Sequence, residues 1–184
     1  MDWLAPLYDG WSIDFWIVDN KGDWLLPSRQ KKVHQKVAFN PNFVVQTKIK
    51  QLKKRLFLEA WIQIEDRSPL LTVKVEGLAF HGGWLIASIR PYNPEGISFI
   101  EDLSFNARQN AWQVNKTSFV ALDRSPDKVR FSEFRKGDVF QYIFTKQKHN
   151  RDSVHCSLGL ASGAALFNLG QDQVRSIRLS IISI

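Results

Sequence analysis

Alternation of apolar and polar residues is the feature that most constrains this chain. In the longest stretch, every second residue from Leu56 to Ile64 is apolar. Because successive side chains of a β-strand point to opposite faces, a period of two predicts a strand with one buried face. The same pattern predicts strands over 71–76, 85–90, 140–145 and 177–181. Weaker signals mark 11–18, 43–49, 97–105, 111–114, 119–122 and 154–160.

Polar turn sequences separate these stretches. Asp19–Gly22, His81–Gly83 and Asn93–Gly96 are the clearest turns, and Lys50–Lys54 predicts a hairpin connection. The best helical candidate, 161–169, is short and contains a glycine. A chain of 184 residues with no linker and no repeat fits one ordinary domain. We therefore predict an all-β, antiparallel two-sheet sandwich with little helix, as a single domain over residues 1–184.

The positive charge is concentrated in one segment. Residues 24–58 hold nine Lys and Arg and no Asp or Glu, within a net charge of +7. One interpretation is a basic patch for a polyanion, and the other is a solvated hairpin whose charges prevent edge-to-edge association. No nucleic-acid motif accompanies the charge, so we do not expect nucleic acid as a partner. The patch candidates are Lys48, Lys50, Lys53, Lys54 and Arg55.

Residue patterns that would indicate catalysis are missing from the sequence. The four histidines show no metal-ligand spacing, and a single cysteine excludes an intrachain disulfide and a Cys-based zinc site. Adjacent acids at Glu65–Asp66 and Glu101–Asp102 would diverge on a strand rather than converge on one bond. We expect no catalytic residue, no metal and no cofactor, and we expect Cys156 to be a buried, inert thiol.

Two further patterns concern surfaces. Trp61 shares its strand face with Glu59, Gln63 and Glu65, which makes it a candidate for stacking on a sugar ring, although tryptophan more often fills a core. No run of 18 apolar residues is present, so no membrane span is predicted. The first residues lack the basic and apolar regions of a signal peptide, and we expect a cytoplasmic location.

Residues 84–100 read WLIASIRPYNPEGISFI. This segment resembles the Arg-Pro-(Tyr/Phe)-Asn-Pro-x-Gly, Ile-x-x-Ile segment of one domain type. That domain is the N-terminal β-sandwich, or supersandwich, of bacterial glycogen-debranching (amylo-α-1,6-glucosidase-like) and glucoamylase-like proteins. Looser similarities are found at Leu26–Ser28, Val33–Gln35, Thr47 and Phe167–Leu179.

The resemblance implies a sandwich that precedes a helical (α/α)₆ barrel, and in such proteins the barrel supplies the catalytic carboxylates. The expected function is then a non-catalytic accessory domain that packs on the helical catalytic domain of the same polypeptide, with contact to an α-glucan as a further role. The 184 residues would be the N-terminal part of a longer protein. The alternative is a stand-alone carbohydrate- or polyanion-binding module.

The physical properties of the motif leave its role open. Pro91 cannot donate to a strand ladder and ends the strand, and Gly96 can adopt the positive φ of a turn. In the functional interpretation, Arg90, Tyr92 and Asn93 present polar groups to a glycan or to the catalytic domain. In the structural interpretation, Arg90 anchors a corner by pairing with Glu95, Glu101 or Asp102, because its five donors suit that task.

Overall fold

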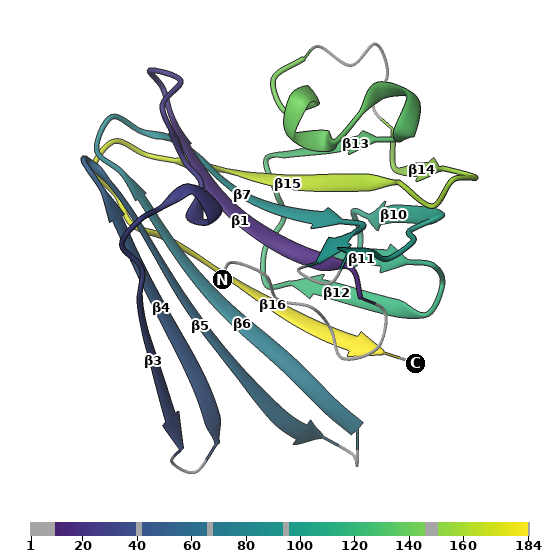
Figure 1. Ribbon diagram of the computed structural model, residues 1–184, viewed down its shortest axis with the longest axis horizontal. Helices are drawn as coiled ribbons and strands as arrows, with labels where there is room; N and C mark the ends of the chain where they lie inside the picture. Colours follow the sequence, from purple (N-terminus) through teal and green to yellow (C-terminus); the bar gives the residue numbers. More distant parts are fainter. Residues whose placement is uncertain (1–9, 40–41, 66–67, 94–95, 146–150, 184) are drawn as a thin grey trace.

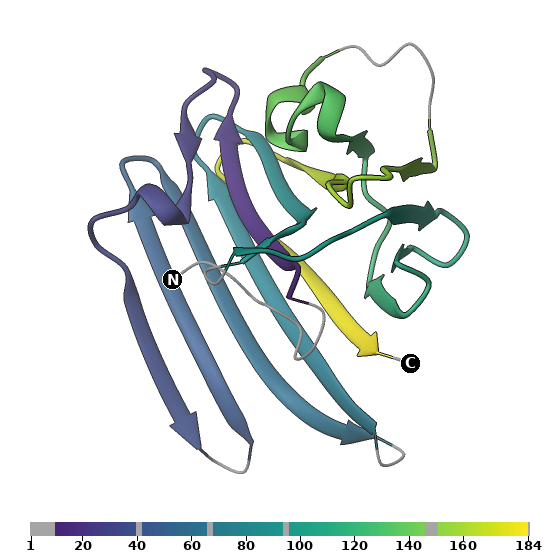
Figure 2. The same ribbon diagram turned by 45° about the vertical axis from the view of Figure 1, so that its right-hand side comes forward.

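The computed structural model describes residues 10–39, 42–65, 68–93, 96–145 and 151–183, and these form two antiparallel sheets packed face to face (Figures 1 and 2). The predicted all-β sandwich is confirmed. The five-stranded sheet has the order β13 (Lys128–Ser132), β15 (Ser162–Leu169), β7 (Gly83–Arg90), β1 (Ser12–Asp19), β2 (Trp24–Leu25). The nine-stranded sheet has the order β14 (Ser153–His155), β10 (Asp102–Asn106), β11 (Ala111–Val114), β12 (Ser118–Leu122), β16 (Arg175–Ser183), β6 (Ser68–Ala79), β5 (Lys54–Glu65), β4 (Phe43–Gln51), β3 (His34–Phe39). A small ribbon pairs β8 (Tyr92–Asn93) with β9 (Gly96–Ile97).

The main core lies between the inner faces of the two sheets. Apolar and polar residues alternate between the two faces of the nine-stranded sheet, as predicted. Leu56 of β5 and its apolar neighbours on β6 and β16 point inward and are buried. Three large aromatic side chains, Trp11, Trp112 and Phe167, are fully buried there. Burying such side chains is the main source of stability for a fold made of many short strands.

The five-stranded sheet is covered on its outer face as well. Three 3₁₀ helices are described: η1 (Pro27–Arg29), η2 (Phe134–Lys136) and η3 (Val139–Tyr142). Val139 and Ile143 pack with Trp16 and Ile86 in a second apolar cluster on this outer face. The strand predicted over 140–145 is therefore wrong. Asp138 begins η3 instead, because its carboxylate accepts the backbone N–H of Phe140 at 2.9 Å, as an N-cap does.

The helix predicted over 161–169 is also wrong, because these residues form β15. This strand lies between β13 and β7, and only Asn168 of its eight residues is exposed. Gly163 allows the inner face to approach Trp112, since a Cβ atom at Gly163 would lie 2.7 Å from the indole. Three strands that the sequence patterns did not predict, β2, β3 and β13, complete the two sheets.

The predicted hairpin at Lys50–Lys54 is confirmed as the β4–β5 turn, with Leu52 at a positive φ of 48°. The turn at Asp19–Gly22 is confirmed too. The strand expected over 97–105 divides into β9 and β10, and only the start of 154–160 is a strand. Asp66, part of the predicted acid pair, lies outside the described residues. In the described part of the chain, no helix is long and apolar enough to cross a membrane.

Candidate carbohydrate and domain contacts

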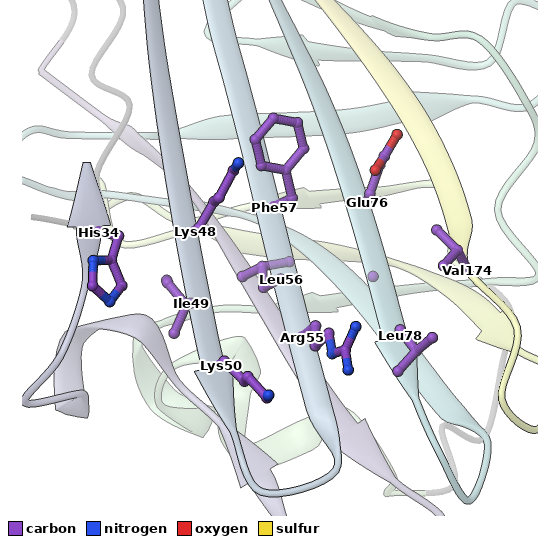
Figure 3. A pocket seen from close by; sticks show the side chains of 11 residues that line it. His34, Lys48, Ile49, Lys50, Arg55, Leu56, Phe57, Glu76, Leu78 and Val174 are labelled. Atoms are coloured by element: carbon purple, nitrogen blue, oxygen red, sulfur yellow. The ribbon is translucent and has the colours of Figure 1, made fainter. Parts of the chain in front are cut away.

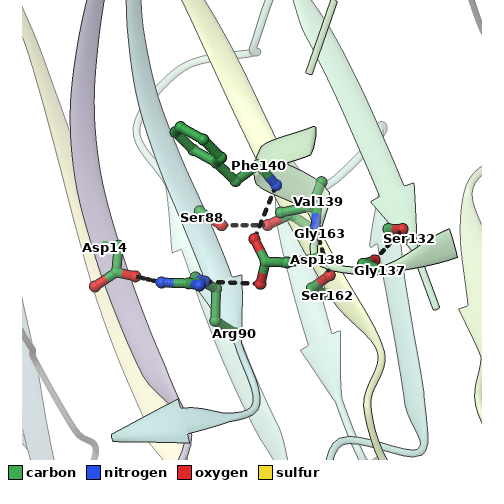
Figure 4. Close-up of polar contacts among 10 residues, drawn as sticks. All are labelled: Asp14, Ser88, Arg90, Ser132, Gly137, Asp138, Val139, Phe140, Ser162 and Gly163. Carbon is green, nitrogen blue, oxygen red and sulfur yellow. Dashed lines mark hydrogen bonds and ion pairs between the residues drawn. The ribbon is translucent and has the colours of Figure 1, made fainter. Parts of the chain in front are cut away.

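Arg90 lies at the end of β7, on the outer face of the five-stranded sheet. Its Nη1 donates to Oδ2 of Asp14 on β1 at 2.7 Å, and its Nε donates to Oδ2 of Asp138 at 2.9 Å (Figure 4). The guanidinium also lies 5.5 Å from the ring centroid of Trp16 and 5.0 Å from that of Tyr92. Two carboxylates and two aromatic faces therefore surround this guanidinium.

The contacts of Asp138 extend from Arg90 into the segment that covers the sheet. One carboxylate oxygen of Asp138 binds Arg90, and the other caps η3. Next to it, the backbone N–H of Val139 donates to Oγ of Ser162 on β15 at 3.0 Å (Figure 4). These bonds join β1, β7, β15 and η3. This arrangement agrees with the structural interpretation of Arg90. The described partners are Asp14 and Asp138 rather than the predicted Glu101 or Asp102, and the third predicted partner, Glu95, lies outside the described residues.

Electrostatics favour the charged form of Arg90. Burial acts to lower the pKa of this guanidinium, but the carboxylates of Asp138 and Asp14 outweigh that effect and raise it above its ordinary value. The pKa of the Tyr92 hydroxyl is raised, first by burial and then by the charge of Asp138. Tyr92 therefore stays a neutral phenol, suited to hydrogen bonding rather than to proton transfer at neutral pH.

Asn93 holds the turn that follows. Its Oδ1 accepts the backbone N–H of Gly96 at 2.9 Å, and its Nδ2 donates to the carbonyl of Gly10. Gly96 has φ of 142°, the positive value expected from the sequence. Asn93 thus ties the start of the described chain to the β8–β9 ribbon, which accounts for the amide without a ligand.

Trp61 occupies a different surface. It lies on the outer face of the nine-stranded sheet, between Val44 of β4 and Thr72 of β6, and is partly exposed. Glu59 and Gln63 share this face, as predicted. Because Arg90 lies on the outer face of the other sheet, the structure does not bring Trp61 together with Arg90, Tyr92 and Asn93.

The five basic residues predicted to form a surface patch do not all lie on the surface. Lys48, Lys50, Lys53 and Arg55 are exposed, but Lys54 is buried and its Nζ lies 2.8 Å from Oδ2 of Asp19. Lys54 points to the inner face, with the parity of Leu56, and this corrects its assignment to the surface patch. Burial acts to raise the pKa of Asp19, but Lys54 and two backbone N–H groups lower it below its ordinary value.

Other groups that the sequence singled out have ordinary surroundings. Cys156 is buried, as predicted. Nδ1 of His155 lies 2.8 Å from Oδ1 of Asp102 on the neighbouring strand, an exposed pair that the sequence did not reveal because the two residues are 53 positions apart. Within the described ranges, no group of three His, Cys, Asp or Glu side chains is placed to hold a metal ion.

Comparison with known proteins identifies the fold. No protein-family model and no curated protein sequence matches the chain. Among solved structures, a bacterial glucoamylase complexed with acarbose matches over 94% of this chain with a TM-score of 0.57 and 15% sequence identity. A putative kojibiose phosphorylase from the human microbiome matches over 100% of the chain with a TM-score of 0.49 and 7% identity. The chain covers 27% and 25% of those two chains. It therefore has the fold of a sandwich found within a bacterial glucoamylase, and it spans about a quarter of that protein.

Proposed function

We propose that this chain is a non-catalytic accessory domain of a glycoside-hydrolase-like protein and that it packs on a helical catalytic domain of the same polypeptide. The observation that supports this most is the fold similarity to part of a bacterial glucoamylase, which extends over 94% of the chain. In the segment that suggested the relation, Arg90 binds Asp138 and lies against Tyr92, and Asn93 accepts the backbone N–H of Gly96.

An exposed apolar surface supports domain packing. Where β3 and β5 end and β4 begins, the inner face of the nine-stranded sheet extends beyond the five-stranded sheet (Figures 1 and 2). Phe39 and Ile64 there are 75% and 79% exposed. Clustered exposed apolar side chains are typical of a surface that another domain covers. We call this set the apolar overhang; it comprises Val37, Phe39, Phe43, Ile62 and Ile64.

The size of the natural polypeptide tests the proposal most directly. An immunoblot of source cells, followed by intact-mass measurement, should detect a product several times larger than 21.3 kDa. A product near that mass would overturn the accessory-domain assignment. The purified 184-residue chain should also release no sugar from α-glucans, and turnover proportional to protein concentration would contradict its non-catalytic role.

Contact with an α-glucan is the finer part of the proposal, and Trp61 is its candidate residue. Its partly exposed indole lies among polar neighbours, the setting in which an aromatic face can stack on a sugar. Titration with maltoheptaose, followed by ¹⁵N–¹H NMR, should shift the indole signal of Trp61, and Trp61→Ala should abolish binding. Trp84→Ala is the matched control, because Trp84 is partly exposed on the other sheet. Equal loss of binding in both variants would refute the assignment to Trp61.

A further inference from the structure

A groove on the outer face of the nine-stranded sheet has the properties of a ligand site. It has a volume of about 470 Å³ and lies beside the β4–β5 turn. In Figure 3, Lys48 and Lys50 come from β4, Arg55 and Phe57 from β5, and Leu78 from β6. The volume falls within the range of small-molecule sites. We refer to these five residues as the cation-rimmed groove.

The rim carries three cations, Lys48, Lys50 and Arg55. Lys50 and Arg55 are direct cross-strand neighbours, and Lys48 lies two residues from Lys50 on the same face. Among the described residues, none of the three has an acidic partner within ion-pair distance. Like charges directly opposite each other on a sheet are destabilising. A bound anion would remove this repulsion.

The acid that lines this groove is already paired with a lysine. Glu76 also lines the groove, but its Oε1 lies 2.7 Å from Nζ of Lys74, and this bond raises the pKa of Lys74. The surrounding segment, residues 24–58, supplies no Asp or Glu. The groove therefore presents uncompensated positive charge to a ligand.

Apart from His34, the rest of the lining is apolar. The Phe57 ring and the Leu78 side chain line the groove beside the charged groups, and Nζ of Lys48 lies 5.5 Å from the Phe57 ring centroid. A hydrated polyanion would leave this apolar surface unused. An apolar body with one carboxylate would cover it, and the fork of Arg55 could bind that carboxylate through two parallel hydrogen bonds.

From this combination we infer that the cation-rimmed groove binds a small amphipathic carboxylate, with the carboxylate at Lys50 and Arg55 and the apolar body over Phe57 and Leu78. This inference does not depend on the proposed accessory role. Decanoate is a suitable probe, with decanamide as its neutral counterpart and a heparin hexasaccharide as a purely polyanionic ligand. Binding to the 184-residue chain is measured by calorimetry and by ¹⁵N–¹H NMR below the micellar concentration.

Decanoate should bind with a stoichiometry of one and shift the amide signals of groove residues. Lys50→Gln/Arg55→Gln should weaken binding by about tenfold or more, because hydrogen bonds to charged groups are lost. Leu78→Asn should weaken it as well. The matched control is Lys36→Gln/Lys53→Gln, which removes the same charge from exposed positions outside the groove and should leave decanoate binding unchanged.

Three results would overturn the inference. Decanamide could bind as tightly as decanoate, which would make the cations irrelevant. Heparin could bind while decanoate does not, and the groove variant and the control variant could lose heparin affinity equally. That result would indicate a diffuse polyanion-binding surface. Decanoate could fail to bind at millimolar concentration. Urea unfolding serves as the folding check, because Lys50→Gln/Arg55→Gln removes a like-charge contact and should be at least as stable as the parent chain.

Discussion

The buried ion pair between Lys54 and Asp19 allows a stringent test of the structure through the variant Lys54→Met. The two side chains are 3% and 5% exposed and meet at 2.8 Å. Removing one partner of a buried pair typically costs about 3–5 kcal/mol, because a buried charge is left uncompensated. Asp19 would keep backbone N–H bonds from Lys21 and Asp23, each 3.0 Å long, so we expect the lower end, about 3 kcal/mol.

Urea unfolding followed by tryptophan fluorescence measures this loss, and a thermal scan should show a Tm lower by about 6–12 °C for a chain of this size. Lys53→Met is the control, since Lys53 is adjacent in sequence but exposed in the turn, with its Nζ 5.0 Å from the Phe80 ring centroid. It should change the free energy of unfolding by about 0.5 kcal/mol or less. Equal stability of the two variants at neutral pH would refute the buried-pair assignment.

The pH dependence of the same pair has a defined sign. The folded pKa of Asp19 is lowered below its ordinary value of 3.8, so its contribution to stability is present at neutral pH and is lost as the pH falls through the folded pKa. Below that pH, the parent chain has a buried Lys54 with a neutral partner. The stability gap between the parent chain and Lys54→Met should therefore narrow below about pH 4, and a gap that widens there would contradict the argument.

Three further outcomes follow from single contacts. Arg90→Lys should lower the free energy of unfolding in urea by about 1–2 kcal/mol, because a lysine cannot bridge the carboxylates of Asp14 and Asp138 with the same geometry. The control Arg178→Lys, at an exposed position, should leave the free energy of unfolding unchanged, and equal effects of the two substitutions would argue against a stabilising role of Arg90. Gly163→Ala should cost about 1–3 kcal/mol and alter the near-ultraviolet circular dichroism of Trp112, and an unchanged spectrum would contradict that packing. Cys156 should not react with Ellman's reagent in the native chain and should react fully in urea; fast native labelling would show that the thiol is accessible.

Sequence patterns predict this fold best where one face of a strand is buried and the other is solvated. β5 and β6 are of this type, and their alternation could be read directly. β15 is buried on both faces, so Ser162–Leu169 shows no alternation and its small residues resemble a short helix. Residues 140–145 show the opposite problem. They alternate, but the Asp138 cap and packing onto the outer face form a 3₁₀ helix that no period-two pattern reveals.

The candidate residues show the same limit. The structural role of Arg90 followed from its donor chemistry, but its partners Asp14 and Asp138 are 76 and 48 positions away, beyond any local pattern. Lys54 is different, because the sequence contained the decisive signal. It shares the parity of Leu56 and Leu58, which places it on the inner face, whereas the density of positive charge suggested a surface position. For a charged residue within a strong strand, periodicity was the better guide.

The two proposed contact surfaces are compatible with each other. The outer face of the five-stranded sheet is covered in part by the chain's own Val139 and Ile143, whereas the side chains of the apolar overhang are exposed among the described residues. The cation-rimmed groove lies at the other end of β5 and on the opposite face of the sheet. Arg55 and Ile64 are nine residues apart on this strand, or about 30 Å. A domain that covers the overhang would therefore leave the groove open, so substitutions at one surface should leave binding at the other unchanged.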